Sequence, residues 1–223
     1  MKWWMIVVFV VFGLVADVVV FRILLKRAKH TGRNDPNWQD LARQLGLTLS
    51  GGDPVFPAIR WLAFMVRPVE LIGTWREWPI RIYGYAQGSG KSSIAHLAIE
   101  LTGPNPKGLQ LYLARKGRWI SGRPKPGPYT AALQAVQTGD EAMDAKVNVW
   151  ASDPVFLRTA LLPEIKTRLV RLLESGSGAE IRLEGATLIY DEVGGMGTEA
   201  KARIPEAVET LGAWRGIVAF YNR

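Results

Sequence analysis

Two short segments carry residues of the kinds that bind nucleotides and metal ions. Residues 88–93 read GSGKSS and match the end of a phosphate-binding loop, in which a lysine contacts the phosphates and a serine the metal. Residues 187–192 read TLIYDE and match an apolar strand that ends at a magnesium-binding carboxylate. Together they suggest a nucleotide hydrolase. The residues that it would use are Gly88, Gly90, Lys91, Ser92, Asp191 and Glu192.

The surrounding sequence argues against this chemistry. The full phosphate-loop pattern needs glycine at position 85, where the chain has Tyr85. Such a loop follows a buried parallel strand and opens a helix, whereas the residues on both sides of GSGK alternate as in a hairpin. Residues 187–192 also follow residues 179–185 across a two-residue turn. We therefore predict two hairpins and no catalytic residue, and keep a nucleotide-binding ATPase or GTPase as the alternative.

Other reactive residues are few. The chain has no cysteine, and its two histidines, His30 and His96, offer little for zinc or haem. Three carboxylates cluster near position 140, where helix capping and solvation explain them. They are Asp140, Glu141 and Asp144. We expect no enzyme activity, no cofactor, no metal and no nucleic-acid partner.

The elements that would position such residues begin with an apolar run at residues 3–21, which contains one charge. About 20 apolar residues span the ~30 Å core of a bilayer as a helix. The run exceeds the usual apolar core of a signal peptide (~7–15 residues), and no small-x-small cleavage site precedes Arg22. We predict a single transmembrane helix that is retained. Its interfacial residues are Trp3, Trp4, Arg22, Lys26, Arg27 and Lys29.

The distribution of positive charge predicts the orientation of this segment. Six of the 28 Lys and Arg residues lie in residues 1–33, with one of them before the apolar run and five after it. The positive-inside rule places the following domain in the cytoplasm and the N-terminus outside. The basic cluster would attract anionic lipids, and the absence of cysteine agrees with a reducing compartment. We therefore predict a cytoplasmic-membrane location.

One face of the predicted helix carries a small residue next to a carboxyl group. Gly13, Asp17, Val20 and Leu24 follow helical spacing. A carboxyl group near the middle of a bilayer costs at least ~2.5 kcal/mol, and small residues favour close helix contact. This face therefore suits contact with another membrane helix. In the alternative interpretation Asp17 is protonated or pairs with Arg22.

The rest of the chain predicts an α+β domain. Residues 30–36 form a polar linker, and residues 37–223 form the domain, possible sub-modules being 37–138 and 139–223. Alternating runs predict strands at residues 71–75, 78–86, 92–101, 108–117, 146–152, 179–185 and 186–195. Helical spacing, caps and prolines predict helices at residues 38–45, 129–137, 155–162, 164–174 and 198–221, the last interrupted or begun at Pro205. Strands in antiparallel sets, with helices grouped between them, favour α+β over a βαβ series.

Two segments of the domain suit contacts with lipid or a partner. Residues 57–67 are apolar, carry Arg60, Trp61 and Arg67, and predict either an interfacial helix or a buried one. Residues 115–128 contain five basic residues and no acidic one. They predict either a solvated loop or a contact with lipid headgroups or an acidic partner. The contact residues of this second segment are Arg115, Lys116, Arg118, Trp119, Arg123 and Lys125.

Residues 138–174 begin TGDEAMD and continue through an Asp-Pro helix start into a helix. With residues 181–195, 73–85 and 101–113, they resemble a group of uncharacterised bacterial, often membrane-associated proteins. Met143 departs from the pattern, which has Phe at this position. The resemblance implies no activity, cofactor or catalytic residue, and it favours the hairpin interpretation.

We therefore expect a non-enzymatic accessory, scaffold or assembly subunit of a larger bacterial membrane complex. Its predicted partners are other membrane protein subunits and anionic lipids. Respiratory, photosynthetic, secretory and envelope complexes fit equally well. The alternatives are the nucleotide-binding ATPase or GTPase described above and a peripheral lipid- or envelope-binding module.

Overall fold

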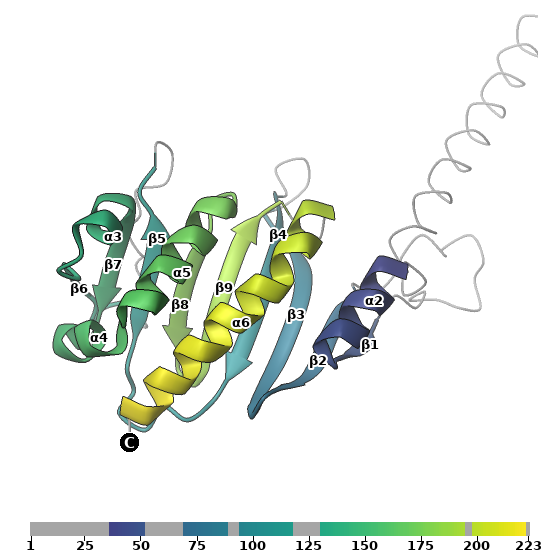
Figure 1. Ribbon diagram of the computed structural model, residues 1–223, viewed down its shortest axis with the longest axis horizontal. Helices are drawn as coiled ribbons and strands as arrows, with labels where there is room; N and C mark the ends of the chain where they lie inside the picture. The colour runs from purple at the N-terminus through teal and green to yellow at the C-terminus, as the bar shows by residue number, and fades with distance from the viewer. Residues whose placement is uncertain (1–35, 52–68, 89–93, 118–129, 195–197, 222–223) are drawn as a thin grey trace, which may run out of the picture.

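Nine antiparallel strands form one sheet, in the order β1-β2-β3-β4-β9-β8-β5-β7-β6 (Figure 1). The structure is a computed structural model that describes residues 36–51, 69–88, 94–117, 130–194 and 198–221. The strands are β1 (Thr48–Ser50), β2 (Glu70–Trp75), β3 (Trp78–Gln87), β4 (Ile94–Thr102), β5 (Leu111–Arg115), β6 (Gln134–Ala135), β7 (Val147–Ala151), β8 (Glu180–Glu184) and β9 (Thr187–Val193). The helices are α2 (Pro36–Leu45), α3 (Glu141–Lys146), α4 (Pro154–Ala160), α5 (Pro163–Ser175) and α6 (Thr198–Tyr221).

The strand order brings distant parts of the sequence together. β8 and β9 form a hairpin that lies between β4 and β5. Ala98 of β4 therefore pairs with Asp191 of β9, and Tyr112 of β5 pairs with Arg182 of β8. Side chains from both halves of the chain consequently meet on the middle strands.

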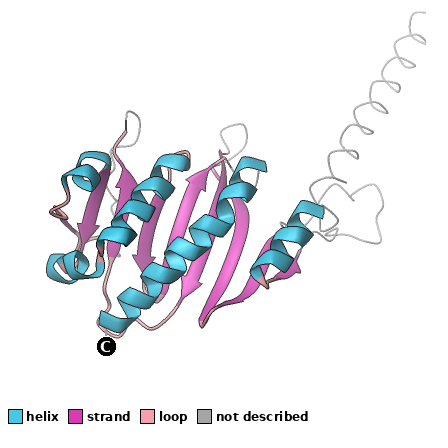
Figure 2. Ribbon diagram, viewed as in Figure 1, coloured by secondary structure: helices cyan, strands magenta, loops and turns pink. Residues whose placement is uncertain are grey.

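The described helices lie on one side of the sheet (Figure 2). Strand residues alternate, so each strand turns one set of side chains toward the helices and the other set away from them. On β4, Leu97, Ile99 and Leu101 are buried in the core that the sheet forms with the helices. The helices contribute apolar residues at helical spacing, among them Leu169 and Leu172 of α5 and Ile204, Val208, Leu211, Trp214 and Val218 of α6.

Local sequence signals explain where several helices begin and end. Gly46, with a φ of +65°, follows the end of α2, as glycine commonly does at a helix terminus. Asp153 caps α4 by accepting a hydrogen bond from the backbone N–H of Phe156, at 2.9 Å. Asp140 caps α3 in the same way, accepting from the N–H of Met143 at 3.1 Å. Pro205 lies inside α6, which begins at Thr198.

The helix predicted over residues 129–137 is wrong. Residues 134–135 instead form β6, which pairs with β7, and the backbone N–H of Val136 donates to the carbonyl of Val149 at 2.8 Å. Pairing with a neighbouring strand thus overrides the helix preference of this alanine-containing segment. α3, a helix of six residues, was not predicted.

The predicted fold class also requires correction. The described part of the chain forms one nine-stranded antiparallel sheet with helices, and the predicted transmembrane helix is not among the described elements. Within the described ranges, no helix combines the length and hydropathy that a membrane crossing needs. Residues 1–29, for which we predicted the transmembrane anchor and a basic juxtamembrane segment, lie outside those ranges.

Candidate functional site

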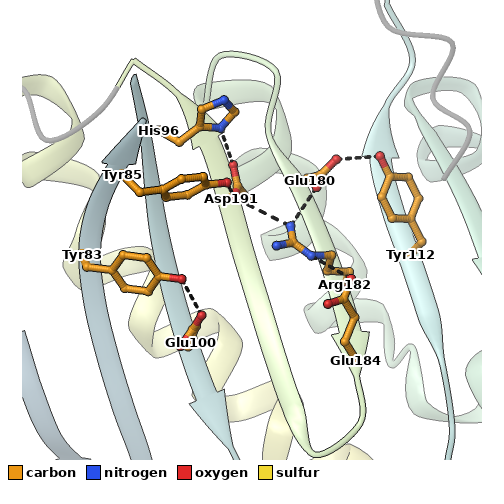
Figure 3. A network of polar contacts seen from close by, with 9 residues as sticks. All are labelled: Tyr83, Tyr85, His96, Glu100, Tyr112, Glu180, Arg182, Glu184 and Asp191. Carbon is orange, nitrogen blue, oxygen red and sulfur yellow. Dashed lines mark hydrogen bonds and ion pairs between the residues drawn. The ribbon is translucent and has the colours of Figure 1, made fainter. Parts of the chain in front are cut away.

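The side of the sheet that faces away from the helices carries a cluster of polar side chains, each hydrogen-bonded or ion-paired to at least one other member (Figure 3). We call this side the polar face. Alternation places these side chains there because their strand neighbours, such as Leu97 and Leu183, are buried toward the helices. The residues of the network are Tyr83, Tyr85, His96, Glu100, Tyr112, Glu180, Arg182, Glu184 and Asp191.

Asp191 lies at the centre of this network. One carboxylate oxygen, Oδ1, lies 2.7 Å from Nδ1 of His96. The other, Oδ2, accepts a hydrogen bond from the hydroxyl of Tyr85 and lies 3.7 Å from Nη1 of Arg182. The rings of Tyr85 and His96 are stacked, with centroids 5.0 Å apart. These neighbours leave the Asp191 side chain only 5% exposed, so both of its oxygens are already committed to the protein.

Arg182 joins three carboxylates. Its guanidinium lies 2.8 Å from Glu180 and 3.0 Å from Glu184, in addition to the contact with Asp191. Burial alone would lower the pKa of Arg182, but the charges of these three carboxylates outweigh it and the pKa is raised. The guanidinium therefore remains a cation that neutralises part of the surrounding negative charge.

Three tyrosines on the polar face donate to carboxylates. Tyr83 donates to Glu100 at 2.6 Å and Tyr112 donates to Glu180 at 2.7 Å, while Tyr85 donates to Asp191. Burial, followed by the hydrogen bond to Glu100, raises the pKa of Tyr83 to about 12. Burial, followed by the hydrogen bond to Asp191, raises the pKa of Tyr85, and burial with the hydrogen bond to Glu180 raises that of Tyr112. These phenols therefore stay neutral donors near pH 7 and do not act as bases or nucleophiles.

The arrangement suits binding better than catalysis. His96 and Asp191 form a pair of the kind that orients a general base, yet no serine, cysteine or lysine of the described network stands beside them. Three cavities among the described residues lie elsewhere, lined by residues of α3 and α5, of α5 and α6, or of the turns beside the end of α6. The described residues also contain no group of three or more His, Cys, Asp and Glu side chains that could hold a metal.

The geometry of the two nucleotide-like segments is that of hairpins. Gln87 and Ile94 are register partners in antiparallel strands, so residues 88–93 connect β3 to β4 and do not lead from a parallel strand into a helix. Gly88 is described, whereas Gly90, Lys91 and Ser92 lie outside the described residues.

Asp191 and Glu192 point to opposite sides of the sheet because they are neighbours on one strand. Glu192, 1% exposed, lies on the helix side, where it accepts from the hydroxyl of Tyr190 at 2.7 Å and from Arg203 at 2.9 Å. The two carboxylates therefore cannot converge on one metal ion.

Two of the predicted contact residues lie within the described ranges, and each donates a hydrogen bond to a carbonyl near the C-terminal end of a helix. Arg115 donates to the carbonyl of Glu174 at 3.3 Å, and Lys116 donates to the carbonyl of Asp144. These carbonyls belong to the last turns of α5 and α3, where cations are favoured. The other predicted contact residues lie outside the described residues, namely Trp3, Trp4, Gly13, Asp17, Val20, Arg22, Leu24, Lys26, Arg27, Lys29, Arg60, Trp61, Arg67, Arg118, Trp119, Arg123 and Lys125.

Sequence reasoning missed the polar network, although one signal for it was present. Polar residues recur at every second position of β8 (Glu180, Arg182 and Glu184) and at Tyr83 and Tyr85 of β3. This spacing places them on one face of each strand. It does not reveal that β9 pairs with β4, which is what brings Asp191 to His96.

Comparison with known proteins leaves the assignment open. No protein-family model matches the chain, and no curated protein matches it. A similar solved structure is the crystal structure of the mycobacterial trehalose monomycolate transport factor A. It shares 12% identity with this chain, and the superposition covers 82% of this chain and 92% of that one with a TM-score of 0.47. Values this low do not establish a shared fold and assign no function.

Proposed function

We propose that the chain is a non-enzymatic accessory or scaffold subunit of a larger bacterial membrane complex. In this proposal the sheet docks on a neighbouring protein subunit through the polar face. The observation that carries the proposal is that the side chains able to do chemistry on this face are bound to one another. Asp191, for example, accepts a hydrogen bond from Tyr85 at one carboxylate oxygen and contacts His96 with the other.

A network of this kind favours recognition because its members are held in fixed positions. Tyrosine, tryptophan and arginine are enriched in protein interfaces, where they combine apolar area with hydrogen bonds. The polar face supplies all three types, since Trp150 lies opposite Tyr112 in the register and the two rings are 5.7 Å apart. Ordered side chains also lose little conformational freedom when a partner binds.

The charge of the polar face indicates the kind of partner. Counting Asp, Glu, Lys and Arg on the sheet strands, this face carries Glu70, Glu100, Glu180, Glu184 and Asp191 against Arg81 and Arg182. Two cations minus five anions give −3, whereas the chain as a whole carries +8. Complementary charge therefore favours a partner subunit that presents a basic surface.

We also propose that the complex lies at the cytoplasmic membrane, with the sheet on its cytoplasmic side. The apolar and basic residues that support this location, together with the predicted contact with anionic lipids, belong to the undescribed N-terminal part of the chain.

A matched pair of glutamates tests the docking surface. Glu184 on the polar face and Glu206 on α6 are similarly exposed (39% and 49%), and each pairs with one arginine, at 3.0 and 3.2 Å. The tagged full chain is purified in mild detergent from its native cell, and co-purifying subunits are quantified by mass spectrometry. We expect Glu184→Lys to reduce the stoichiometric partner by about tenfold or more, the effect of losing ~1.4 kcal/mol of binding energy. Glu206→Lys should leave it unchanged.

Equal recovery with both variants would contradict docking through the polar face. A wild-type chain that purifies alone would contradict a stable complex altogether.

A further inference from the structure

A groove opens on the helix side of the sheet, between the first turns of α5 and the last turns of α6 (Figure 1). Its volume is about 560 Å³, which makes it the largest of the three cavities described above. Because the described helices all lie on one side of the sheet, the groove and the polar face are on opposite sides (Figure 2). The groove is therefore a second surface, separate from the polar face.

Most of the groove is lined by apolar residues. Ile165 of α5 is 5% exposed, and Ala213 and Ile217 of α6 are half-buried. Leu162, which precedes α5, also lines the groove and is 43% exposed. Tyr221, 39% exposed, follows Ala213 and Ile217 at the same four-residue spacing and so continues their stripe along α6. Apolar surface gathered in this way, with charged residues beside it, is typical of an interaction site.

Two charged residues beside this apolar surface have no partner of their own. Glu164 and Arg168 of α5 are exposed, and both line the groove. Although they are four residues apart on one helix, neither side chain forms an ion pair or a hydrogen bond with any described residue. The third charged residue of the lining, Glu209, is instead paired with Arg76 at 2.7 Å. The groove thus keeps one anion and one cation that are available to another molecule.

We propose that two copies of this chain associate through this groove about a two-fold axis. An axis that crosses α5 midway between Glu164 and Arg168 sets the two α5 helices antiparallel, so Glu164 of each copy meets Arg168 of the other. The same rotation sets the two apolar linings against each other. The available charges cancel, so the groove is complementary to itself and does not favour a partner of a single charge sign. This dimer does not depend on docking through the polar face.

The mass of the full chain in solution measures the association. The chain is purified in mild detergent, and sedimentation equilibrium in a density-matched buffer gives the protein mass as a function of concentration. We expect a reversible dimer. A wild-type chain that stays monomeric at every concentration would overturn the proposal.

Two single charge reversals test the two-fold geometry. Glu164→Arg leaves two positive charges beside the groove, and Arg168→Glu leaves two negative ones. In a dimer of either variant, like charges replace both ion pairs, so the Kd of each variant alone should rise about tenfold or more. A mixture of the two variants should dimerise again, because the positive groove then faces the negative one.

Glu199→Arg is the matched control for the change in net charge. Glu199 is also exposed, and at 1.5 Å per residue it lies ~21 Å from Ala213 along α6. Its Kd should equal that of the wild type. Equal dimerisation of the wild type and of every variant would place the contact elsewhere, such as in the predicted membrane helix, and would overturn the proposal. A mixture that dimerises no better than the single variants would contradict the two-fold pairing.

A second pair of substitutions tests the apolar lining. Leu162 and Ile94 of β4 are both exposed aliphatic residues, at 43% and 51%. Leu162→Ser removes apolar surface from both halves of the interface and should raise the Kd about tenfold. Serine also suits the N-cap position that Leu162 occupies, so α5 is retained. Ile94→Ser should leave the Kd unchanged. No effect of Leu162→Ser, or an equal effect of Ile94→Ser, would contradict association through the groove.

Discussion

Arg182 and Arg215 are two largely enclosed arginines in very different surroundings. Arg182 lies on the polar face within 4 Å of three carboxylates, whereas Arg215 lies under α6 with no carboxylate paired to it among the described residues. The pKa of Arg182 is raised and that of Arg215 is lowered. On the polar face the charge of the arginine is neutralised by carboxylates, whereas under α6 the guanidinium is held by two backbone carbonyls.

The two environments have different consequences for binding. On the polar face, the network presents a fixed pattern of hydroxyls, rings and carboxylates to a partner. Beneath α6, the guanidinium of Arg215 donates to the carbonyls of Pro104 and Ala186, and three of its N–H groups have no acceptor among the described residues. The first arrangement favours a broad protein contact, whereas the second is enclosed within the fold.

The largest expected loss of stability follows from removing Arg182, whose charge is neutralised by carboxylates. Arg182→Met would leave Glu180, Glu184 and Asp191 close together without their shared cation. Removing one partner of a fully buried ion pair costs ~3–5 kcal/mol, and because Arg182 keeps 22% exposure we expect a loss of about 2–4 kcal/mol. Urea unfolding of the full chain measures it, and a loss below about 1 kcal/mol would mean that the network is mostly screened by solvent.

A smaller loss of stability is expected from adding a methyl group beside Arg215. In Gly103→Ala, the new methyl group would lie 2.7 Å from Nε of Arg215 and 2.8 Å from Cε3 of Trp78. Overpacking of this kind costs about 1–3 kcal/mol, which urea unfolding would detect. An unchanged free energy of unfolding would show that the guanidinium and the indole ring are able to move apart.

Replacing Arg215 itself should change the free energy of unfolding only slightly. Arg215→Met removes two hydrogen bonds to carbonyls but also removes a buried charge that lacks a counter-ion. Apolar replacement of buried charges is often neutral or stabilising, so we expect a change within about 1 kcal/mol. A loss as large as that of Arg182→Met would erase the difference between the two arginines.

The smallest effect concerns the phenols of the polar face. Tyr83 has a pKa of about 12 in the folded chain, against about 10 for an unfolded tyrosine. Its contribution to stability is therefore fully present below pH 10 and is lost as the pH rises toward about 12. An absorbance titration at the tyrosinate band, comparing the wild type with Tyr83→Phe, should show one phenol titrating near pH 12. A difference spectrum centred near pH 10 would contradict both the burial of this phenol and its hydrogen bond to Glu100.

The sequence predicted the local elements better than their assembly. The hairpins β3–β4 and β8–β9 follow from alternation and turn residues, which act over a few positions. The helix predicted at 129–137 failed because the pairing of β6 with β7 decided the conformation of that segment. The contact between His96 and Asp191 spans 95 positions and depends on strand order. Arg215 gave no signal either, because a charged residue on a helix normally indicates the exposed face.

Oxidative footprinting of the full chain, free and within its purified complex, shows whether the polar face is covered by a partner. Tyr83 and Trp150 lie on the polar face, and Phe156 on α4 is a half-buried aromatic of the helix layer. If the polar face is the docking surface, oxidation of Tyr83 and Trp150 should fall several-fold in the complex while that of Phe156 stays the same. Protection of Phe156 with unchanged Tyr83 and Trp150 would contradict the account.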